Sequence, residues 1–241
     1  MNVPVLRPQK CEECPIRHRA VCARCDDDEF VHLEDMKYYR SYEAGQPILW
    51  RGDEMANVAS LVRGVASISQ TMEDGRRQMV GLLLPSDFIG RPGRERVLFD
   101  VTAVTDVTLC CFKRRPFERL VDASPNISKR LLEMTLDELD SARDWMLLLG
   151  RKTARERIST FIRMVARRSQ VPEDDDSPNI IELPLTREAM ADYLGLTLET
   201  VSRQISALKR DNMIRLHGKR GIEILSQTRL AAEAGEDAFI D

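Results

Sequence analysis

The pattern of apolar residues changes at Ser124-Pro125, and this change constrains the fold of the 241-residue chain more than any other feature. Between about residues 40 and 120, glycines separate short apolar runs, of which residues 58–62 are one example. An Asp74-Gly75 pair stands between two such runs and is a hairpin signal. This first part is therefore expected to form a small antiparallel sandwich or barrel.

After Pro125 the apolar residues follow a helical period, and one helix can continue to Gly150. A stripe with coiled-coil spacing contains Leu132, Thr135, Leu139, Ala142, Met146 and Leu149. A second stripe contains Ile127, Leu131 and Met134 and can pack on the chain's own sheet. Two separate apolar faces on one helix predict a homodimer. Its seam would contain Leu132, Leu139, Ala142 and Met146; an ordinary monomer core is the alternative interpretation.

Residues 186 to about 211 have the pattern of a helix-turn-helix. Thr186 and Thr197 can each cap a helix, and Gly195 can form the tight turn between the helices. On the second helix, a polar arc contains Glu199, Ser202, Arg203 and Ser206. The opposite side contains Val201, Ile205 and Leu208. One face is thus expected to anchor the helix and the other to be free.

This free face has the chemistry needed to read the major groove of DNA. Arg203 can bind guanine through two hydrogen bonds, Glu199 can accept from the cytosine amino group, and Ser202 can contact a base edge or phosphate. Residues 214–225 then predict a hairpin with a basic tip, which a winged helix-turn-helix places against phosphates. An ordinary surface helix in a helical bundle is the alternative.

The net charge of −3 does not indicate a nucleic-acid-binding protein, although a local basic face can bind phosphate despite an acidic average. Acidic residues concentrate at 26–29 and 173–176. Because nothing nearby completes a metal-binding loop, both runs are interpreted as solvated surface and loops.

The six cysteines fall into two groups. Four lie near the start, at Cys11, Cys14, Cys22 and Cys25, and the others are the adjacent Cys110 and Cys111. The chain shows neither a secretory signal nor an apolar segment long enough to span a membrane, so we expect a cytoplasmic protein. There, dense cysteines more often bind metal than form disulfides. Thiolates suit both iron–sulfur clusters and zinc.

A glycine-punctuated β-roll, a long helix and a winged helix-turn-helix, in this order, resemble the CRP/FNR superfamily of bacterial transcription regulators across residues 36–230. Residues 194–203, Leu-Gly-Leu-Thr-Leu-Glu-Thr-Val-Ser-Arg, are similar to the recognition motif of its FNR branch. The resemblance implies that Glu199, Ser202 and Arg203 read a TTGAT-type half-site. A homodimer would then read a palindrome in double-stranded DNA, and RNA polymerase is a further implied partner.

The resemblance implies an α+β chain of four parts. Residues 1–35 would form an N-terminal cluster-binding arm and residues 36–123 an antiparallel β-roll sensory domain. Residues 124–150 would form the dimerisation helix, and residues 151–241 the winged helix-turn-helix domain.

Members of the superfamily that bind cyclic AMP carry an Arg-Ser pair before a Val-x-Ala strand. In this chain the strand resembles residues 101–103, and the pair falls at Val97-Leu98. Two apolar residues cannot neutralise a phosphate, so we expect no cyclic-nucleotide ligand.

The spacing Cys11-x2-Cys14-x7-Cys22 plus a distant cysteine resembles the FNR-type oxygen sensors of alphaproteobacteria. In that family a [4Fe-4S] cluster takes three ligands from the arm and a fourth from the strand that leads into the dimer helix. Neighbouring side chains on a strand point to opposite faces, so only one of Cys110 and Cys111 is expected to meet the arm. The match of Phe112 to an apolar family position favours Cys110.

Cys25 leaves a second possibility open, because four thiolates of the arm could hold zinc. The seven residues between the two pairs are shorter than the usual zinc-ribbon span. In the favoured assignment the ligands are Cys11, Cys14, Cys22 and Cys110, Cys25 is a spare thiol, and His18 is a surface residue.

The family mechanism implies that an intact cluster orders the arm against the dimer helix and that oxygen reverses this order. Some members carry an acidic residue on the seam where this chain has Ala142. The cluster could therefore act here on helix orientation while the dimer persists. A regulator of the same fold that uses zinc or thiol oxidation is the nearest alternative.

The sequence also bears on two other classes of protein, enzymes and adaptors. No nucleotide-binding glycine fingerprint and no Ser-His-Asp set is apparent, so we assign no catalytic residues and do not expect an enzyme. The second class is an adaptor protein that does not bind DNA, and it stays open as an alternative.

Overall fold

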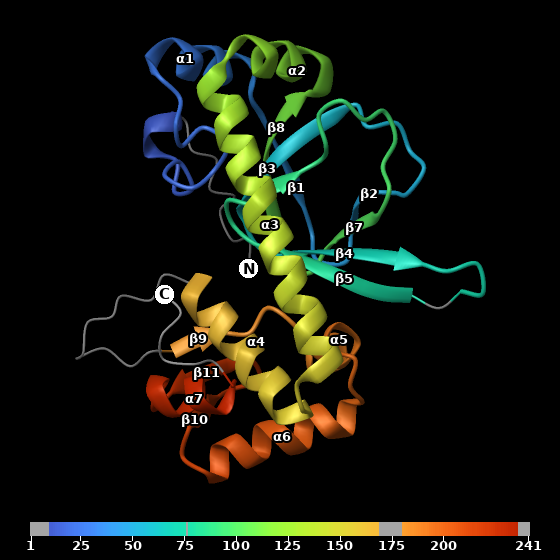
Figure 1. Ribbon diagram of the computed structural model, residues 1–241, viewed down its shortest axis with the longest axis vertical. Helices are drawn as coiled ribbons and strands as arrows, with labels where there is room; N and C mark the ends of the chain where they lie inside the picture. Colours follow the sequence, from blue (N-terminus) through green and yellow to red (C-terminus); the bar gives the residue numbers. More distant parts are fainter. Residues whose placement is uncertain (1–9, 76, 169–179, 236–241) are drawn as a thin grey trace. The chain divides into compact units, whose positions relative to one another are not determined.

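The computed structural model describes residues 10–75, 77–168 and 180–235. The chain forms two compact units, Met1–Asp140 and Ser141–Asp241 (Figure 1). Helix α3 (Pro125–Arg151) begins in the first unit and ends in the second. Among the helices of the described residues, none combines the length and apolar character needed to cross a bilayer.

The first unit contains two four-stranded antiparallel sheets, as the spacing of the apolar runs predicts. One sheet has the order β1 (Tyr38–Tyr42), β8 (Val107–Lys113), β3 (Asn57–Arg63), β6 (Phe88–Ile89). The other has the order β2 (Pro47–Leu49), β7 (Asp100–Ala103), β4 (Ala66–Thr71), β5 (Arg77–Leu83). The predicted hairpin at Asp74-Gly75 is confirmed, because β4 pairs with β5 and Gly75 has a φ of 85°.

Two hydrophobic cores lie on opposite faces of the β1-β8-β3-β6 sheet. The inter-sheet core joins side chains of both sheets, among them Leu61, Leu109 and Val101. The arm-side core joins the other face of the first sheet to the N-terminal arm and helices, through residues such as Phe112, Val21 and Phe117. β8 contributes to both cores, because successive side chains on a strand alternate between faces.

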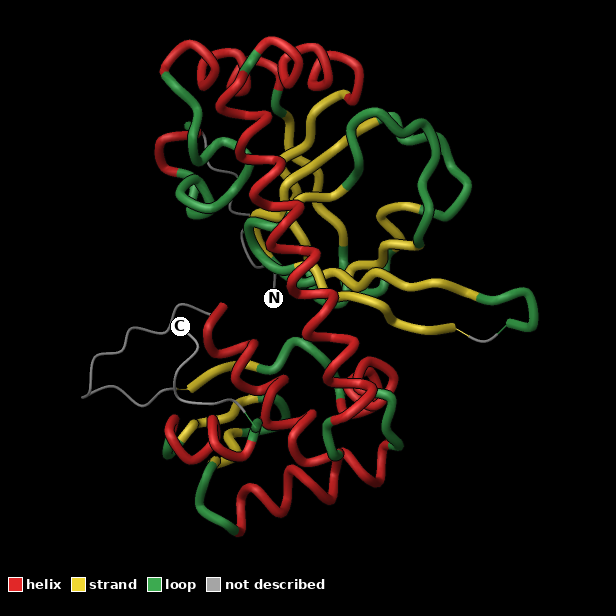
Figure 2. Tube along the Cα trace, viewed as in Figure 1, coloured by secondary structure: helices red, strands yellow, loops and turns green. Residues whose placement is uncertain are grey.

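The first unit also contains three short helices, drawn in red in Figure 2: η1 (Cys11–Glu13), α1 (Asp27–Met36) and α2 (Arg114–Ala123). Leu33 of α1 and Phe117 of α2 are buried in the arm-side core. Residues 26–28 are exposed, as the interpretation of residues 26–29 as solvated surface predicts, but this run caps and starts α1 and is not a loop. Asp26 accepts a hydrogen bond from the Glu29 amide at 2.9 Å, and the Glu29 carboxylate accepts one from the Asp26 amide at 3.1 Å. This capping box starts α1, and Glu29 is buried. The second acidic run, 173–176, lies outside the described residues.

Helix α3 begins at Pro125, as predicted, and its two apolar stripes have different environments. Ile127 is fully buried, and Leu131 and Met134 pack against the arm-side core. Leu132 is 59% exposed, Leu139 44% and Met146 65%. One stripe therefore belongs to the chain's own core, whereas the other remains uncovered in a single chain.

The second unit contains α4 (Ala154–Arg168), β9 (Ile180–Glu182), α5 (Arg187–Leu194), α6 (Leu198–Arg210), β10 (Ile214–His217), β11 (Gly221–Ile224) and α7 (Gln227–Glu233). The predicted caps are confirmed: Thr186 accepts from the Ala189 amide at 3.1 Å and Thr197 from the Thr200 amide at 3.2 Å. Gly195 ends α5 in the left-handed region, with a φ of 61°. The hairpin β10–β11 was predicted, whereas β9, which completes its sheet, and α7 were not.

Candidate metal centre and nucleic-acid interface

The arm is held against the sheet by its apolar side chains. Ile16, Ala20 and Val21 are buried in the arm-side core and lie between the cysteines in sequence. Cys11, which starts η1, Cys14, which caps its end, and Cys22 line the same cavity as these apolar residues.

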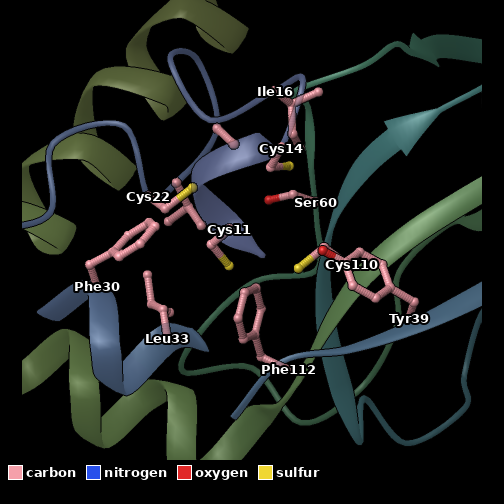
Figure 3. A pocket seen from close by; sticks show the side chains of 12 residues that line it. Cys11, Cys14, Ile16, Cys22, Phe30, Leu33, Tyr39, Ser60, Cys110 and Phe112 are labelled. Atoms are coloured by element: carbon pink, nitrogen blue, oxygen red, sulfur yellow. The ribbon is translucent and has the colours of Figure 1, made fainter. Parts of the chain in front are cut away.

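One cavity, here named the sulfur cavity, brings together three thiols of the arm and one of β8 (Figure 3). Its lining consists of Cys11, Cys14, Ile16, Ala20, Val21, Cys22, Phe30, Leu33, Tyr39, Ser60, Cys110 and Phe112. Within the described parts of the chain, no three His, Cys, Asp or Glu side chains converge closely enough to hold a single metal ion. The four sulfur atoms stand around one space (Figure 3).

The antiparallel register explains why Cys110 faces this cavity and Cys111 does not. Cys110 pairs with Tyr39 on β1 and with Ser60 on β3, so these three side chains share one face of the sheet. Cys111 pairs with Tyr38 and is buried in the inter-sheet core. The strand alternation expected from the sequence therefore separates the two neighbours into different cores.

Cys25 and His18 do not line the sulfur cavity. Cys25 packs at the edge of the arm-side core, and its thiol is near enough to Cys22 for the two to affect each other electrostatically. His18 is exposed. The structure thus groups Cys110, rather than Cys25, with the first three cysteines of the arm.

Burial and mutual repulsion make the cavity unfavourable for four bare thiolates. Burial raises the pKa of Cys22 to about 11, and repulsion from Cys14 and Cys11 adds to this. The pKa of Cys110 is also raised, first by burial and then by Cys11, Cys14 and Cys22. Thiolates in such a place need a compensating positive charge, and a bound metal centre supplies one. The donor set therefore fits a group that Cys11, Cys14, Cys22 and Cys110 could hold together.

Cys11 is further positioned by α1. Its amide donates a hydrogen bond to Glu34 Oε1 at 3.0 Å, and Lys37 Nζ donates to the same oxygen at 3.1 Å. Burial raises the pKa of the Cys11 thiol, while a hydrogen bond from Lys37 opposes that rise. A cation thus stands beside one of the four thiols.

The other end of the arm is tied to the first turns of α3. Arg130 Nε donates to the carbonyl of Ala20 at 3.3 Å, and its guanidinium also donates to the carbonyl of Arg19. Glu133 Oε2 accepts from Arg24 Nε at 2.7 Å and from Arg130 at 3.3 Å. Nothing in the local sequence pattern indicated these contacts. The position of the arm is therefore coupled to the helix that carries the exposed apolar stripe.

The C-terminal end of α3 contacts the helix-turn-helix. Trp145 stacks on Tyr193 of α5 with ring centroids 4.0 Å apart. Arg157 donates to the carbonyls of Leu194 at 2.9 Å and Leu149 at 2.8 Å. The Arg157 guanidinium thus joins the end of α3 to the end of α5, so the two helix ends are expected to move together.

The predicted reading face of α6 is free of the core. Val201, Ile205 and Leu208 are fully buried. Glu199, Ser202 and Arg203 are exposed on the other side. At the hairpin tip, Lys219 is exposed between β10 and β11. These are the two features that a winged helix-turn-helix presents to a groove and to phosphates.

The position that would bind a cyclic nucleotide's phosphate is apolar in the structure as well. Val97 is buried and Leu98 is 46% exposed, just before β7. Neither side chain offers a charge or hydrogen-bond donor.

Two family models match the chain. Residues 39–124 match the cyclic nucleotide-binding domain, and residues 156–233 match the Crp-like helix-turn-helix domain. The first match identifies the β-roll fold, and the second covers the helix-turn-helix and its wing.

Similar whole proteins agree with these matches. The chain is 62% identical over 231 residues to the transcriptional activator protein FnrL of Cereibacter sphaeroides, covering 95% of this chain and 93% of that protein. It is 35% identical to the nitrogen fixation regulation protein FixK of Bradyrhizobium diazoefficiens, covering 93% of each. The solved structure of FixK2 from Bradyrhizobium japonicum matches with a TM-score of 0.75 at 32% identity, covering 85% of this chain and 99% of that one. Together with the domain matches and the fold, these similarities show that the chain belongs to the CRP/FNR family of DNA-binding transcription regulators.

Proposed function

We propose that this regulator responds to oxygen through a [4Fe-4S] cluster held by Cys11, Cys14, Cys22 and Cys110. The observation that carries the proposal is the sulfur cavity, because three thiols of the arm and one of β8 line the same space. Four cysteine thiolates are the usual ligand set of such a cluster. When bound, the cluster supplies a centre that oxygen degrades.

The residues of the chain connect this centre to α3. The cysteines fix the arm to β8, and Arg130 and Glu133 fix the arm to the first turns of α3. The exposed stripe of α3 is proposed as a homodimer seam of Leu132, Leu139, Ala142 and Met146. Loss of order in the arm would then change either the association of the two helices or their relative orientation.

The regulator is proposed to bind TTGAT-type palindromes and so to control genes for anaerobic or microaerobic growth. Glu199, Ser202 and Arg203 would read each half-site in the major groove, and two half-sites match the symmetry of a dimer. RNA polymerase is the proposed protein partner. The apolar pair Val97-Leu98 supports a regulator without a cyclic-nucleotide ligand.

A regulator of the same fold that uses zinc or thiol oxidation is the second candidate. The nearness of Cys25 to Cys22 favours it, since these two could complete a site with Cys11 and Cys14. The absence of Cys25 from the lining of the sulfur cavity opposes it.

Metal analysis of protein purified without oxygen tests the proposal. About four iron and four acid-labile sulfide per chain are expected, with a visible absorption that bleaches in air. DNA affinity should fall as the absorption is lost. Stoichiometric zinc, or no metal, would overturn the oxygen mechanism and leave the assignment to the regulator family intact.

A further inference from the structure

Two hydroxyl groups in the sulfur cavity have no hydrogen-bond partner. Tyr39 Oη and Ser60 Oγ are buried and unpaired, and both residues line the cavity. Within the described residues only three other side chains, Arg17, Ser159 and Arg187, have such an atom. Buried polar groups in native proteins almost always find a partner. These two hydroxyls therefore indicate that a hydrogen-bond partner occupies the space they face.

The two hydroxyls are placed symmetrically about a proposed ligand. Tyr39 and Ser60 are the residues directly opposite Cys110, one on each neighbouring strand. Figure 3 shows both oxygen atoms directed toward the space that the labelled cysteine sulfur atoms surround. The other residues that line this space are cysteine or apolar, so sulfur is the available acceptor chemistry.

We propose that Tyr39 and Ser60 are positioning residues that donate hydrogen bonds to the sulfur atoms of the bound centre and make it harder to oxidise. This inference rests on the proposed function, because it assumes that an iron–sulfur centre occupies the cavity. A hydrogen bond to sulfur withdraws electron density from the cluster, and such bonds are among the factors that set the reduction potential. Two donors beside one cysteine ligand would thus slow the loss of the centre in air.

The experiment compares Tyr39→Phe, Ser60→Ala and the double variant with wild type, all loaded and purified without oxygen. Each variant is expected to keep the iron and sulfide content of wild type and to bleach at least about threefold faster in buffer of fixed oxygen content. The midpoint potential of the bound centre should fall. The potential separates hydrogen bonding from mere access, because a wider entry for oxygen would change the bleaching rate alone.

Two variants provide matched controls. Tyr38→Phe removes the neighbouring hydroxyl, which donates to Asn57 Oδ1 at 2.6 Å and lies away from the cavity. Ser67→Ala removes a buried serine hydroxyl of β4, in the other sheet. Both controls should bleach at the wild-type rate with an unchanged potential.

A stability measurement checks that the variants fold. Because the two hydroxyls are unpaired, removing them should leave the melting temperature of the metal-free protein unchanged or raise it. The proposal is overturned if loaded Tyr39→Phe and Ser60→Ala keep the potential of wild type, whether their bleaching rate is unchanged or faster. If wild type itself holds no iron and sulfide, the proposed function fails first, so the two failures are distinguishable.

Discussion

Cys110 and Cys111 are adjacent in β8, yet their side chains are buried in two different cores. Cys110 lines the sulfur cavity with Cys11, Cys14 and Cys22, whereas Cys111 packs with Leu109 and Val101 in the inter-sheet core. The alternation of side chains along a strand is sufficient to produce this separation. It makes the two cysteines a natural pair for mutation, since the same change has different consequences at each.

Replacing each of the pair by alanine should separate the metal ligand from the core residue. Cys110→Ala is expected to lose most iron and sulfide. Cys111→Ala should retain both and lose about 1 kcal/mol of stability through lost packing. Iron and sulfide assays with chemical denaturation measure these effects. The reverse pattern would show that Cys111 is the ligand.

Cys25→Ala tests the zinc alternative. Because Cys25 does not line the sulfur cavity, the variant should bind the same amount of iron as wild type. A zinc site made only from the arm would require Cys25 and would be lost. Mass spectrometry of the bound metal distinguishes the two sites. Cys22→Ala is the comparison, because it should lose the metal whether the site holds iron or zinc.

Arg130→Ala should loosen the arm while leaving its cysteines in place. The variant removes hydrogen bonds to the carbonyls of Arg19 and Ala20. Amide hydrogens of residues 11–25 should exchange severalfold faster, and affinity for a palindromic site should fall by about three- to tenfold. Lys129→Ala, at an exposed position of the same helix, is the control. Unchanged exchange in Arg130→Ala would contradict a coupling between the arm and α3.

Leu139→Glu should disrupt the proposed dimer. Leu139 is exposed at 44% in a single chain, so the change costs little in the monomer but places two charges against each other at a dimer seam. Sedimentation should show a monomer, and binding to the palindrome should weaken strongly. Val31→Glu, an equivalent change at a residue of α1 that is 55% exposed, should remain dimeric. A dimer that survives Leu139→Glu would place the seam elsewhere.

Arg203→Ala and Lys219→Ala should weaken DNA binding in different ways. Loss of a base contact at Arg203 is expected to cost about 1–3 kcal/mol and to relax specificity at one base pair. Loss of a phosphate contact at Lys219 should weaken all sequences alike and reduce the salt dependence by about one charge. Titrations with single-base variants of the site, at several salt concentrations, measure both effects. If Arg203→Ala weakens every sequence equally, Arg203 does not read a base.

Local signals in the sequence were sufficient to predict several caps and turns of the fold. The caps at Thr186 and Thr197, the turn at Gly195 and the hairpin at Asp74-Gly75 are where the pattern predicts them. Each depends on residues a few positions apart, so the sequence contains the whole cause. The capping box of Asp26 and Glu29 is also local and could have been recognised, because an acidic cap followed by Glu at the third position is a helix-start signal.

Elements that depend on distant partners were not predictable in the same way. β9 is only three residues long, and its pairing with the distant strand β11 decides its conformation. The bond between Arg130 and the carbonyl of Ala20 joins two segments far apart in the chain, and no spacing rule relates them.

The sequence by itself determined that only one of the neighbours Cys110 and Cys111 can face the arm, because successive side chains on a strand point to opposite faces. The tertiary structure decided that Cys110 lies with the thiols of the arm, and what surrounds it. Tyr39 and Ser60 stand beside Cys110 because of the register of three strands, and that register depends on burial of whole sheet faces. A periodic pattern can therefore indicate the face on which a residue lies, but only the folded sheet brings it beside its partners from other strands.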